Sequence, residues 1–209
     1  MMNSDILITI LFAVVIIAIS ITLHEFMHGF MAKALGDSTA EEAERLSLNP
    51  LKHIDPFATV LLPIVLLVIG LPPFGAAKPV PVNFSRLKYE EFGGALVGLV
   101  GPLTNLVLAI VGAVFYRALG VASMNDMGQL FLELFIAINI GFFIFNMIPF
   151  PPLDGSRVLY AFAPGPLQRL MEGIERFGLL AIGIFVIFLI PLISPMLTTI
   201  NNWLINLIV

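Results

Sequence analysis

The sequence of 209 residues contains no cysteine, so thiolate metal ligands, catalytic thiols and disulfide bonds are all excluded. Charged residues are also scarce, at 11% of the chain, whereas soluble domains carry about 25%. Hydrophobic residues make up 59% of the chain, and the mean hydropathy is +1.03. This composition predicts an integral membrane protein that contacts the lipid bilayer.

Basic residues form no cluster of the kind that nucleic-acid binding requires, and the net charge is −4. Nucleic acid is therefore not an expected partner. The first five residues lack the basic region that begins a signal peptide, and the apolar run after them is too long for one. We interpret residues 6–34 as a membrane helix that the protein retains.

Four stretches are apolar and long enough to cross a hydrocarbon core, which takes about 20 residues of helix. They are 6–34, 93–119, 128–149 and 178–208. The last contains Pro191 and Pro195 and is either one kinked helix or two short ones. The predicted fold is an all-α polytopic membrane protein with about four to six transmembrane helices, formed by residues 1–209 as a single domain.

A fifth apolar stretch, 56–71, is short for a span and contains Pro63. Most basic residues fall in three groups, which lie at or after the end of the first apolar stretch, after 56–71 and after the 128–149 stretch: Lys33, Arg45 and Lys52; Lys78, Arg86 and Lys88; Arg157, Arg169 and Arg176. The positive-inside rule places all three groups in the cytoplasm, so 56–71 would enter and leave by the same face. This favours a re-entrant segment over the alternative, a true span.

Ionisable side chains appear at the end of the first apolar stretch, in the sequence HEFMH at 24–28. His24 and His28 are four residues apart, so they share one face of a helix and can hold one metal ion. Glu25 lies roughly 100° around the helix, from where it can reach a water beside the metal without being a ligand. Ionisable groups inside a membrane helix are costly and usually functional. The pattern predicts a zinc protease site within the bilayer.

A hydrolytic zinc site has three protein ligands and an open position for water. We predict that the third ligand is Asp154, which follows Pro149, Pro151 and Pro152. These prolines break the preceding helix, and the break lets a side chain project into the helix bundle. The alternative role for Asp154 is an N-cap of a helix over 156–163.

Two asparagines are candidates for binding the backbone of a peptide substrate. Asn105 follows Gly101 and Pro102 in the 93–119 stretch, and its alternative role is an interhelical hydrogen bond. Asn146 shares a helix face with Asn139, seven residues earlier, and helix packing is its alternative role.

Four prolines interrupt residues 72–83, which therefore cannot be helical. We expect a small extended strand or β-hairpin here, and a simple loop fits equally well. An extended segment near the site would offer unpaired backbone groups, which an unwound substrate could join by strand addition.

Six blocks of the sequence together resemble the site-2 protease family of intramembrane zinc metalloproteases, in its small prokaryotic form without a PDZ domain. The blocks are HEFMHG at 24–29, GD at 36–37 with TA at 39–40, LNPLKHIDP at 48–56, AKPVPV at 77–82, GPLTN at 101–105 and NMIPFPPLDGSR at 146–157. The resemblance implies that His24, His28 and Asp154 bind Zn²⁺ and that Glu25 is the catalytic base. It also implies that the substrates are transmembrane segments of other membrane proteins, cut in regulated intramembrane proteolysis.

The expected location is the inner (plasma) membrane of a prokaryotic cell. The histidines lie towards the end of the first helix, on the side of the first basic loop, so the active site is expected to open toward the cytoplasm. Two alternatives to a protease remain: a membrane protein that binds or transports metal, and an inactive homologue that binds membrane proteins without cutting them. No sequence feature indicates a particular oligomeric state.

Overall fold

The computed structural model describes residues 2–62, 65, 76–120 and 124–208, and all regular secondary structure within these ranges is helical. Four segments in this part of the chain are long and apolar enough to cross a membrane: Asp5–Ala34, Glu90–Leu119, Asp126–Asn146 and Leu179–Leu207. The all-α polytopic membrane fold is therefore confirmed, with candidate spans at the lower end of the predicted number.

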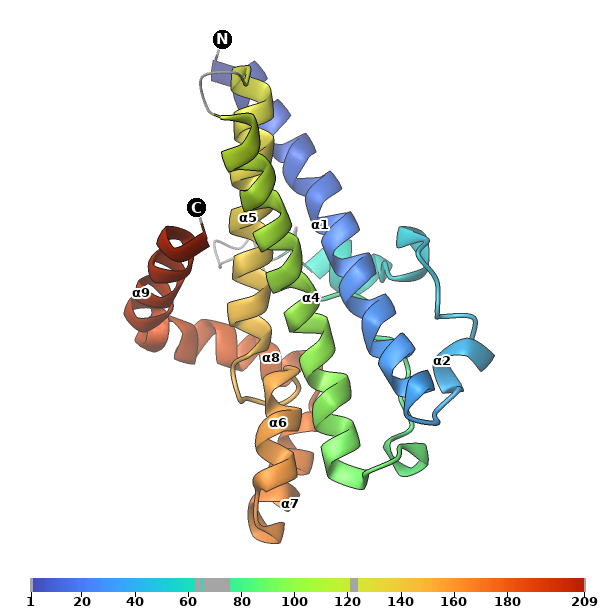
Figure 1. Cartoon of the computed structure of the whole chain (residues 1–209). Helices are drawn as coiled ribbons and strands as arrows, with labels where there is room; N and C mark the ends of the chain where they lie inside the picture. Colours follow the sequence, from blue (N-terminus) through green and yellow to red (C-terminus); the bar gives the residue numbers. More distant parts are fainter. Residues whose placement is uncertain (1, 63–64, 66–75, 121–123, 209) are drawn as a thin grey trace.

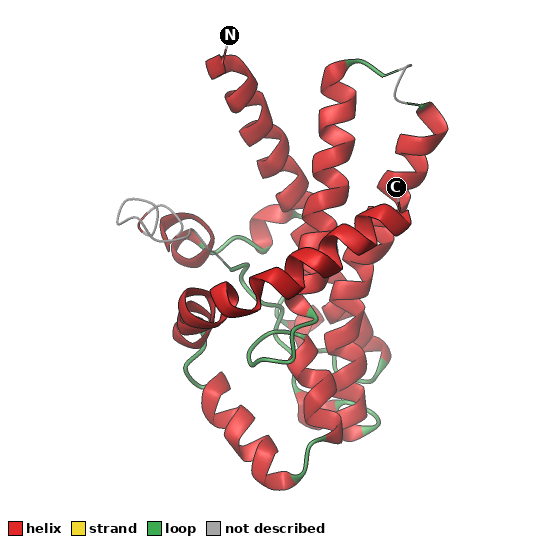
Figure 2. Cartoon of the chain, turned by 90° about the vertical axis from the view of Figure 1, so that its left-hand side faces the viewer, coloured by secondary structure: helices red, strands yellow, loops and turns green. Residues whose placement is uncertain are grey.

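Three long helices form the body of the molecule and run side by side (Figures 1 and 2). They are α1 (Met2–Ala34), α4 (Glu90–Leu119) and α5 (Asp126–Asn146). Small residues let α4 and α5 approach closely, since a Cβ added at Gly112 would lie 2.9 Å from the Phe135 ring. Leu7 and Leu11 of α1 are exposed, as expected for side chains that face lipid.

Shorter helices and single turns lie between α1 and α4 and after α5. The helices are α2 (Thr39–Glu42), α6 (Gly155–Phe162), α7 (Gly165–Glu175), α8 (Leu179–Ile184) and α9 (Ile190–Ile208). The 3₁₀ turns are Pro50–Lys52 and Phe84–Arg86, and the π-helical turns are Pro56–Leu61 and Phe185–Leu189. In Figure 1, α2, α6 and α7 lie at the end of the bundle where α1 ends and α4 begins.

The C-terminal stretch is one continuous helical segment that bends. Of the two alternatives, one kinked helix or two short ones, the kinked helix is observed. The π-helical turn Phe185–Leu189 and the two prolines of α9 lie along it, and both features are known causes of helix bending. Its later part, α9, packs against α5 (Figures 1 and 2). A buried cluster marks where α4, α5 and α9 meet: Ala109, Ala113, Ile136, Ile140 and Leu204.

The third predicted helix, 128–149, ends earlier than expected, at Asn146 instead of residue 149. Pro149 explains the difference, because a proline disfavours helical backbone at the residue before it and donates no N–H. The chain then folds back tightly into α6. A Cβ at Gly155 would lie 2.4 Å from the Met147 carbonyl oxygen, so this turn requires a residue without a side chain.

Asp37, just after the end of α1, connects that helix to the segment 76–83. Gly36 has a φ of +105°, which favours glycine and turns the chain so that Asp37 points inward. Asp37 is fully buried and accepts hydrogen bonds from the Asn83 N–H at 2.6 Å and from the hydroxyl and N–H of Thr39. Burial alone opposes the charged form, but these hydrogen bonds outweigh it and lower the pKa of Asp37 below its usual value.

Two predicted details lie partly outside the described residues. Only 56–62 and 65 of the 56–71 stretch are described, so its re-entrant path stays a prediction. Residues 76–83 run beside α1 without forming a paired strand, while 72–75 lie outside the described residues. The β-hairpin therefore also stays a prediction.

Candidate metal centre

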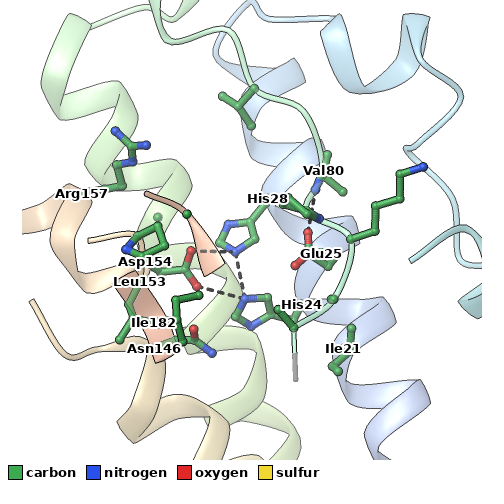
Figure 3. A pocket seen from close by; sticks show the side chains of 18 of the residues that line it. Ile21, His24, Glu25, His28, Val80, Asn146, Leu153, Asp154, Arg157 and Ile182 are labelled. Carbon is green, nitrogen blue, oxygen red and sulfur yellow. Dashed lines mark hydrogen bonds and ion pairs between the residues drawn. The ribbon is translucent and has the colours of Figure 1, made fainter. Parts of the chain in front are cut away.

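His24 and His28 project from successive turns of α1 toward the interior of the bundle (Figure 3). Their Nε2 atoms lie 3.0 Å apart, and both side chains are buried. The four-residue spacing on one helix therefore brings two ring nitrogens to a single point, as the sequence predicted.

Asp154 reaches the same point from the segment between α5 and α6. Its Oδ2 atom lies 3.0 Å from His24 Nε2, and its Oδ1 atom lies 3.3 Å from His28 Nε2. Asp154 stands at the start of α6, but its side chain makes no capping hydrogen bond to that helix. The capping alternative is thus not what the structure shows. One ligand atom from each of the three residues lies within 4.8 Å of the others.

The opposite ring nitrogens determine which atoms face this point. His28 Nδ1 lies 2.7 Å from the Val97 carbonyl oxygen of α4, and a backbone carbonyl only accepts hydrogen bonds. His28 Nδ1 therefore carries a hydrogen, and in the neutral ring Nε2 presents a lone pair. His24 Nδ1 lies 2.6 Å from Asn105 Oδ1, which orients that ring in the same way.

The converging atoms fit a divalent metal. Two imidazole nitrogens and a carboxylate form a usual ligand set of catalytic zinc sites, which leave a fourth position open. A cluster of two buried histidines and a half-buried carboxylate also has too few hydrogens to satisfy its three lone-pair donors, and a cation would compensate the Asp154 charge. The residues present are therefore suited to hold zinc.

Gly101 of α4 allows the two imidazoles to lie against that helix. A Cβ at this position would lie 2.3 Å from His28 Nε2 and 2.8 Å from His24 Cε1, far inside contact distance. Gly98 lies one turn earlier on α4. A Cβ added to Gly98 would lie 2.8 Å from the Asp154 carbonyl oxygen, so a glycine here lets the Asp154 backbone approach. Both sides of the centre thus depend on glycines of α4.

Glu25 points to a different side of α1 from the histidine pair, toward the 76–83 segment (Figure 3). Its Oε2 atom accepts a hydrogen bond of 2.8 Å from the Val80 N–H. The same segment is held by the Lys78 N–H, which donates to the His53 carbonyl at 3.0 Å, and by Asp37 at its other end. The position of Glu25 is therefore coupled to that of the 76–83 segment.

A cavity of about 610 Å³ opens beside these residues. His24, Glu25, His28 and Asp154 all line it, and so does Asn146. Further parts of the wall come from the 76–83 segment, from α4 at Val97 and Gly98, and from the junction of α7 and α8. At its rim, Arg157 donates a hydrogen bond to Glu175 and lies 4.1 Å from the centre of the Phe84 ring.

The two predicted substrate-binding asparagines have different surroundings. Asn146 lines the cavity, with its amide nitrogen donating to the Phe142 carbonyl at 3.1 Å. Asn105 is completely buried behind His24 and is not among the residues that line the cavity. The interhelical hydrogen bond, given as its alternative role, is observed with His24 and with Asn139.

Sequence comparison finds relatives that are named as putative zinc metalloproteases. It is 36% identical over 191 residues to the Bacillus subtilis protein named "Putative zinc metalloprotease YwhC", covering 88% of this chain and 81% of that protein. It is 30% identical over 192 residues to "Putative zinc metalloprotease Rip2" of Mycolicibacterium smegmatis, covering 90% and 68%. Stage IV sporulation protein FB of Bacillus subtilis is 30% identical over 129 residues, covering 59% and 42%.

No family model matches the chain, and no solved structure matches it at a significant level. The identity to YwhC and the extent of that match nevertheless establish the relationship. The chain belongs to the site-2 protease family of zinc metalloproteases.

Proposed function

We propose that this protein, as a single domain formed by residues 1–209, is a zinc endopeptidase that cuts peptide bonds within or near transmembrane segments of other membrane proteins. The observation that carries the proposal is the convergence of His24, His28 and Asp154 beside Glu25 in one cavity of a membrane-spanning bundle. The zinc metalloprotease names of its relatives support the same chemistry.

In this proposal, His24, His28 and Asp154 hold Zn²⁺ through the atoms that converge in the structure. Bound zinc would make a water molecule more acidic and polarise the carbonyl of the bond to be cut. The Asn105 and Val97 oxygens keep the hydrogens on the Nδ1 atoms, so that both Nε2 lone pairs face the ion.

Glu25 acts as the general base. It lines the cavity without belonging to the ligand cluster, as a proton acceptor beside the metal must. Its carboxylate takes one proton from the attacking water as the new C–O bond forms. It then gives that proton to the amide nitrogen as the C–N bond breaks, so the products are a carboxylic acid and an amine.

The substrate segment enters the cavity in an extended form, because a helical backbone has its carbonyl groups bonded internally. Asn146 is placed to contact the substrate backbone, since it lines the cavity. Asn105 is buried behind His24 and bonds to it. This supports a role in orienting the His24 ring, and not contact with the substrate.

The depth and orientation of the site also belong to the proposal. His24 lies ten residues before the end of α1, or roughly 15 Å along the helix, which places it within the hydrocarbon region. The end of α1 and the start of α4 lie together with α6 and α7, and Lys33, Lys88, Arg157 and Arg169 lie in or next to these parts. The positive-inside rule then directs this end, and the cavity, to the cytoplasm of a prokaryotic cell.

The test uses the purified protein in detergent with a synthetic transmembrane peptide that has a glycine and a proline at its centre. We expect zinc in the preparation, cleavage within the apolar segment by mass spectrometry, loss of cleavage with a chelator and recovery on adding zinc. Cleavage only outside the apolar segment would contradict the intramembrane site. Zinc binding without cleavage of any membrane peptide would favour the metal-binding alternative.

A further inference from the structure

A line of buried amide groups connects His24 on α1 to the backbone of α5. Asn105 Oδ1 lies 2.6 Å from His24 Nδ1, and Asn105 Nδ2 donates to Asn139 Oδ1 at 3.0 Å. Asn139 Nδ2 in turn donates to the Phe135 carbonyl oxygen at 2.9 Å. Both asparagines are completely buried. The line therefore has fixed geometry and no competing solvent.

The α5 end of this line determines which way each of the two amide groups is turned. The Phe135 carbonyl only accepts, so Asn139 must turn its NH₂ group toward it and its oxygen toward Asn105. Asn105 must then direct its NH₂ group to Asn139 and its oxygen to His24. Since Asn105 offers an acceptor, His24 Nδ1 carries the hydrogen and Nε2 carries the lone pair.

We propose that Asn139 is a positioning residue that acts through Asn105 to hold His24 in the tautomer whose Nε2 can bind the metal. This inference rests on the zinc-binding role given to His24 under the proposed function. It assigns to α5 a part in the metal centre that is separate from the cavity-lining Asn146.

The two histidines differ in how their tautomers are determined. His28 has its tautomer fixed directly by the Val97 backbone carbonyl, which cannot turn around. Asn105 is a side-chain amide that can present either end to His24. Without Asn139, a turned Asn105 would direct its NH₂ group to Nδ1, which would move the hydrogen to Nε2 and point it at Asp154 and His28. Only His24 therefore needs a second amide behind the first.

The test begins with Asn139→Leu, which has a similar size but neither accepts nor donates. Groups that orient metal-binding histidines typically contribute 10–100-fold to metal affinity. We expect the zinc dissociation constant, measured by competition with a fluorescent chelator in detergent, to rise by about 10–100-fold. Gln129→Leu is the matched control. It removes a side-chain amide from the same helix, but that amide bonds to Glu133, so zinc affinity should stay unchanged.

A rescue experiment separates orientation from general damage to the fold. Asn105→Asp presents an acceptor to His24 whichever way the carboxylate turns. Asn139→Leu should therefore change zinc affinity little when it is introduced into the Asn105→Asp protein. An equal loss in both backgrounds would overturn the proposal. Asn139→Ala removes the same two hydrogen bonds without added bulk and replaces the leucine variant if that does not fold.

A second readout needs no zinc. The ¹⁵N chemical shifts of the His24 ring in the metal-free protein should show hydrogen on Nδ1 in the wild type and a mixture of tautomers in Asn139→Leu. Unchanged shifts and unchanged zinc affinity in the variant would overturn the proposal. A wild type that binds no zinc would instead contradict the proposed function, while the ring shifts would still decide the role of Asn139.

Discussion

Gly101 lies so close to His28 that a Cβ added to it would be 2.3 Å from the Nε2 atom of that imidazole. Normal contacts at a Cβ are 3.4–4 Å, so Gly101→Ala must displace the ring or separate α4 from α1. We predict that this variant is inserted in the membrane but binds zinc at least about 10-fold more weakly, as displaced or misoriented ligands do. Zinc affinity and peptide cleavage measure the effect.

Gly141→Ala supplies the control for this prediction. Gly141 is also a glycine inside a long helix, but a Cβ there would have no atom of the described residues within 4 Å. This variant should bind zinc and cleave like the wild type. Equal zinc affinity in Gly101→Ala and Gly141→Ala would contradict the close approach of α4 to the histidines.

Asp154→Ala removes the carboxylate that lies 3.0 Å from His24 and 3.3 Å from His28. We predict weaker zinc binding and loss of cleavage, because two histidines alone leave the site one ligand short of a catalytic zinc. Zinc content after dialysis against a weak chelator is the measurement. Asp126→Ala, at the start of α5, is a control outside the cluster. Zinc content equal to that of the wild type would remove Asp154 from the ligands.

Asp37→Asn tests the connection between α1 and the 76–83 segment. The asparagine side chain keeps one acceptor oxygen where the aspartate has two. That oxygen can face either the Asn83 N–H or Thr39, so the hydrogen bond to the other is lost. A buried donor without its partner destabilises a protein by about 1–3 kcal/mol. We expect a lower melting temperature in detergent, whereas Glu44→Gln, on an exposed side chain, should leave it unchanged.

The effect of Asp37 also depends on pH. Because the pKa of Asp37 is lowered from 3.8 in the folded protein, its charged form stabilises the fold fully above that unfolded-state value. The stabilisation is lost as the pH falls through the lower folded-state pKa. The difference in melting temperature between wild type and Asp37→Asn should therefore be constant near neutral pH and shrink below about pH 4. A difference that grows on acidification would contradict the assignment.

The sequence was sufficient to predict the long helices and the three converging residues, for reasons that are local. Apolar length identifies a membrane helix, and the four-residue spacing of His24 and His28 places them on one face whatever their neighbours are. The prolines before Asp154 indicated a break from which its side chain leaves the helix axis. The structure confirms the long helices and brings the three side chains together.

The surroundings of these residues were not predictable in the same way, because they depend on how one helix is rotated against another. Asn105 follows a glycine and a proline in the sequence, which does not reveal whether it faces the cavity or the back of His24. The contact of Glu25 with the Val80 N–H joins residues 55 positions apart. The sequence indicates only that Asn139 shares a helix face with Asn146, whereas its link to His24 depends on the positions of three helices.

The most direct test of the proposed chemistry compares wild type and Glu25→Gln for zinc content and for cleavage of the same transmembrane peptide, with Glu44→Gln as the control. Glu25 is outside the ligand cluster, so both proteins should hold equal zinc. Cleavage should fall by about 100-fold or more in Glu25→Gln, because the amide cannot accept the proton from water. Cleavage by Glu25→Gln at the wild-type rate would contradict the account.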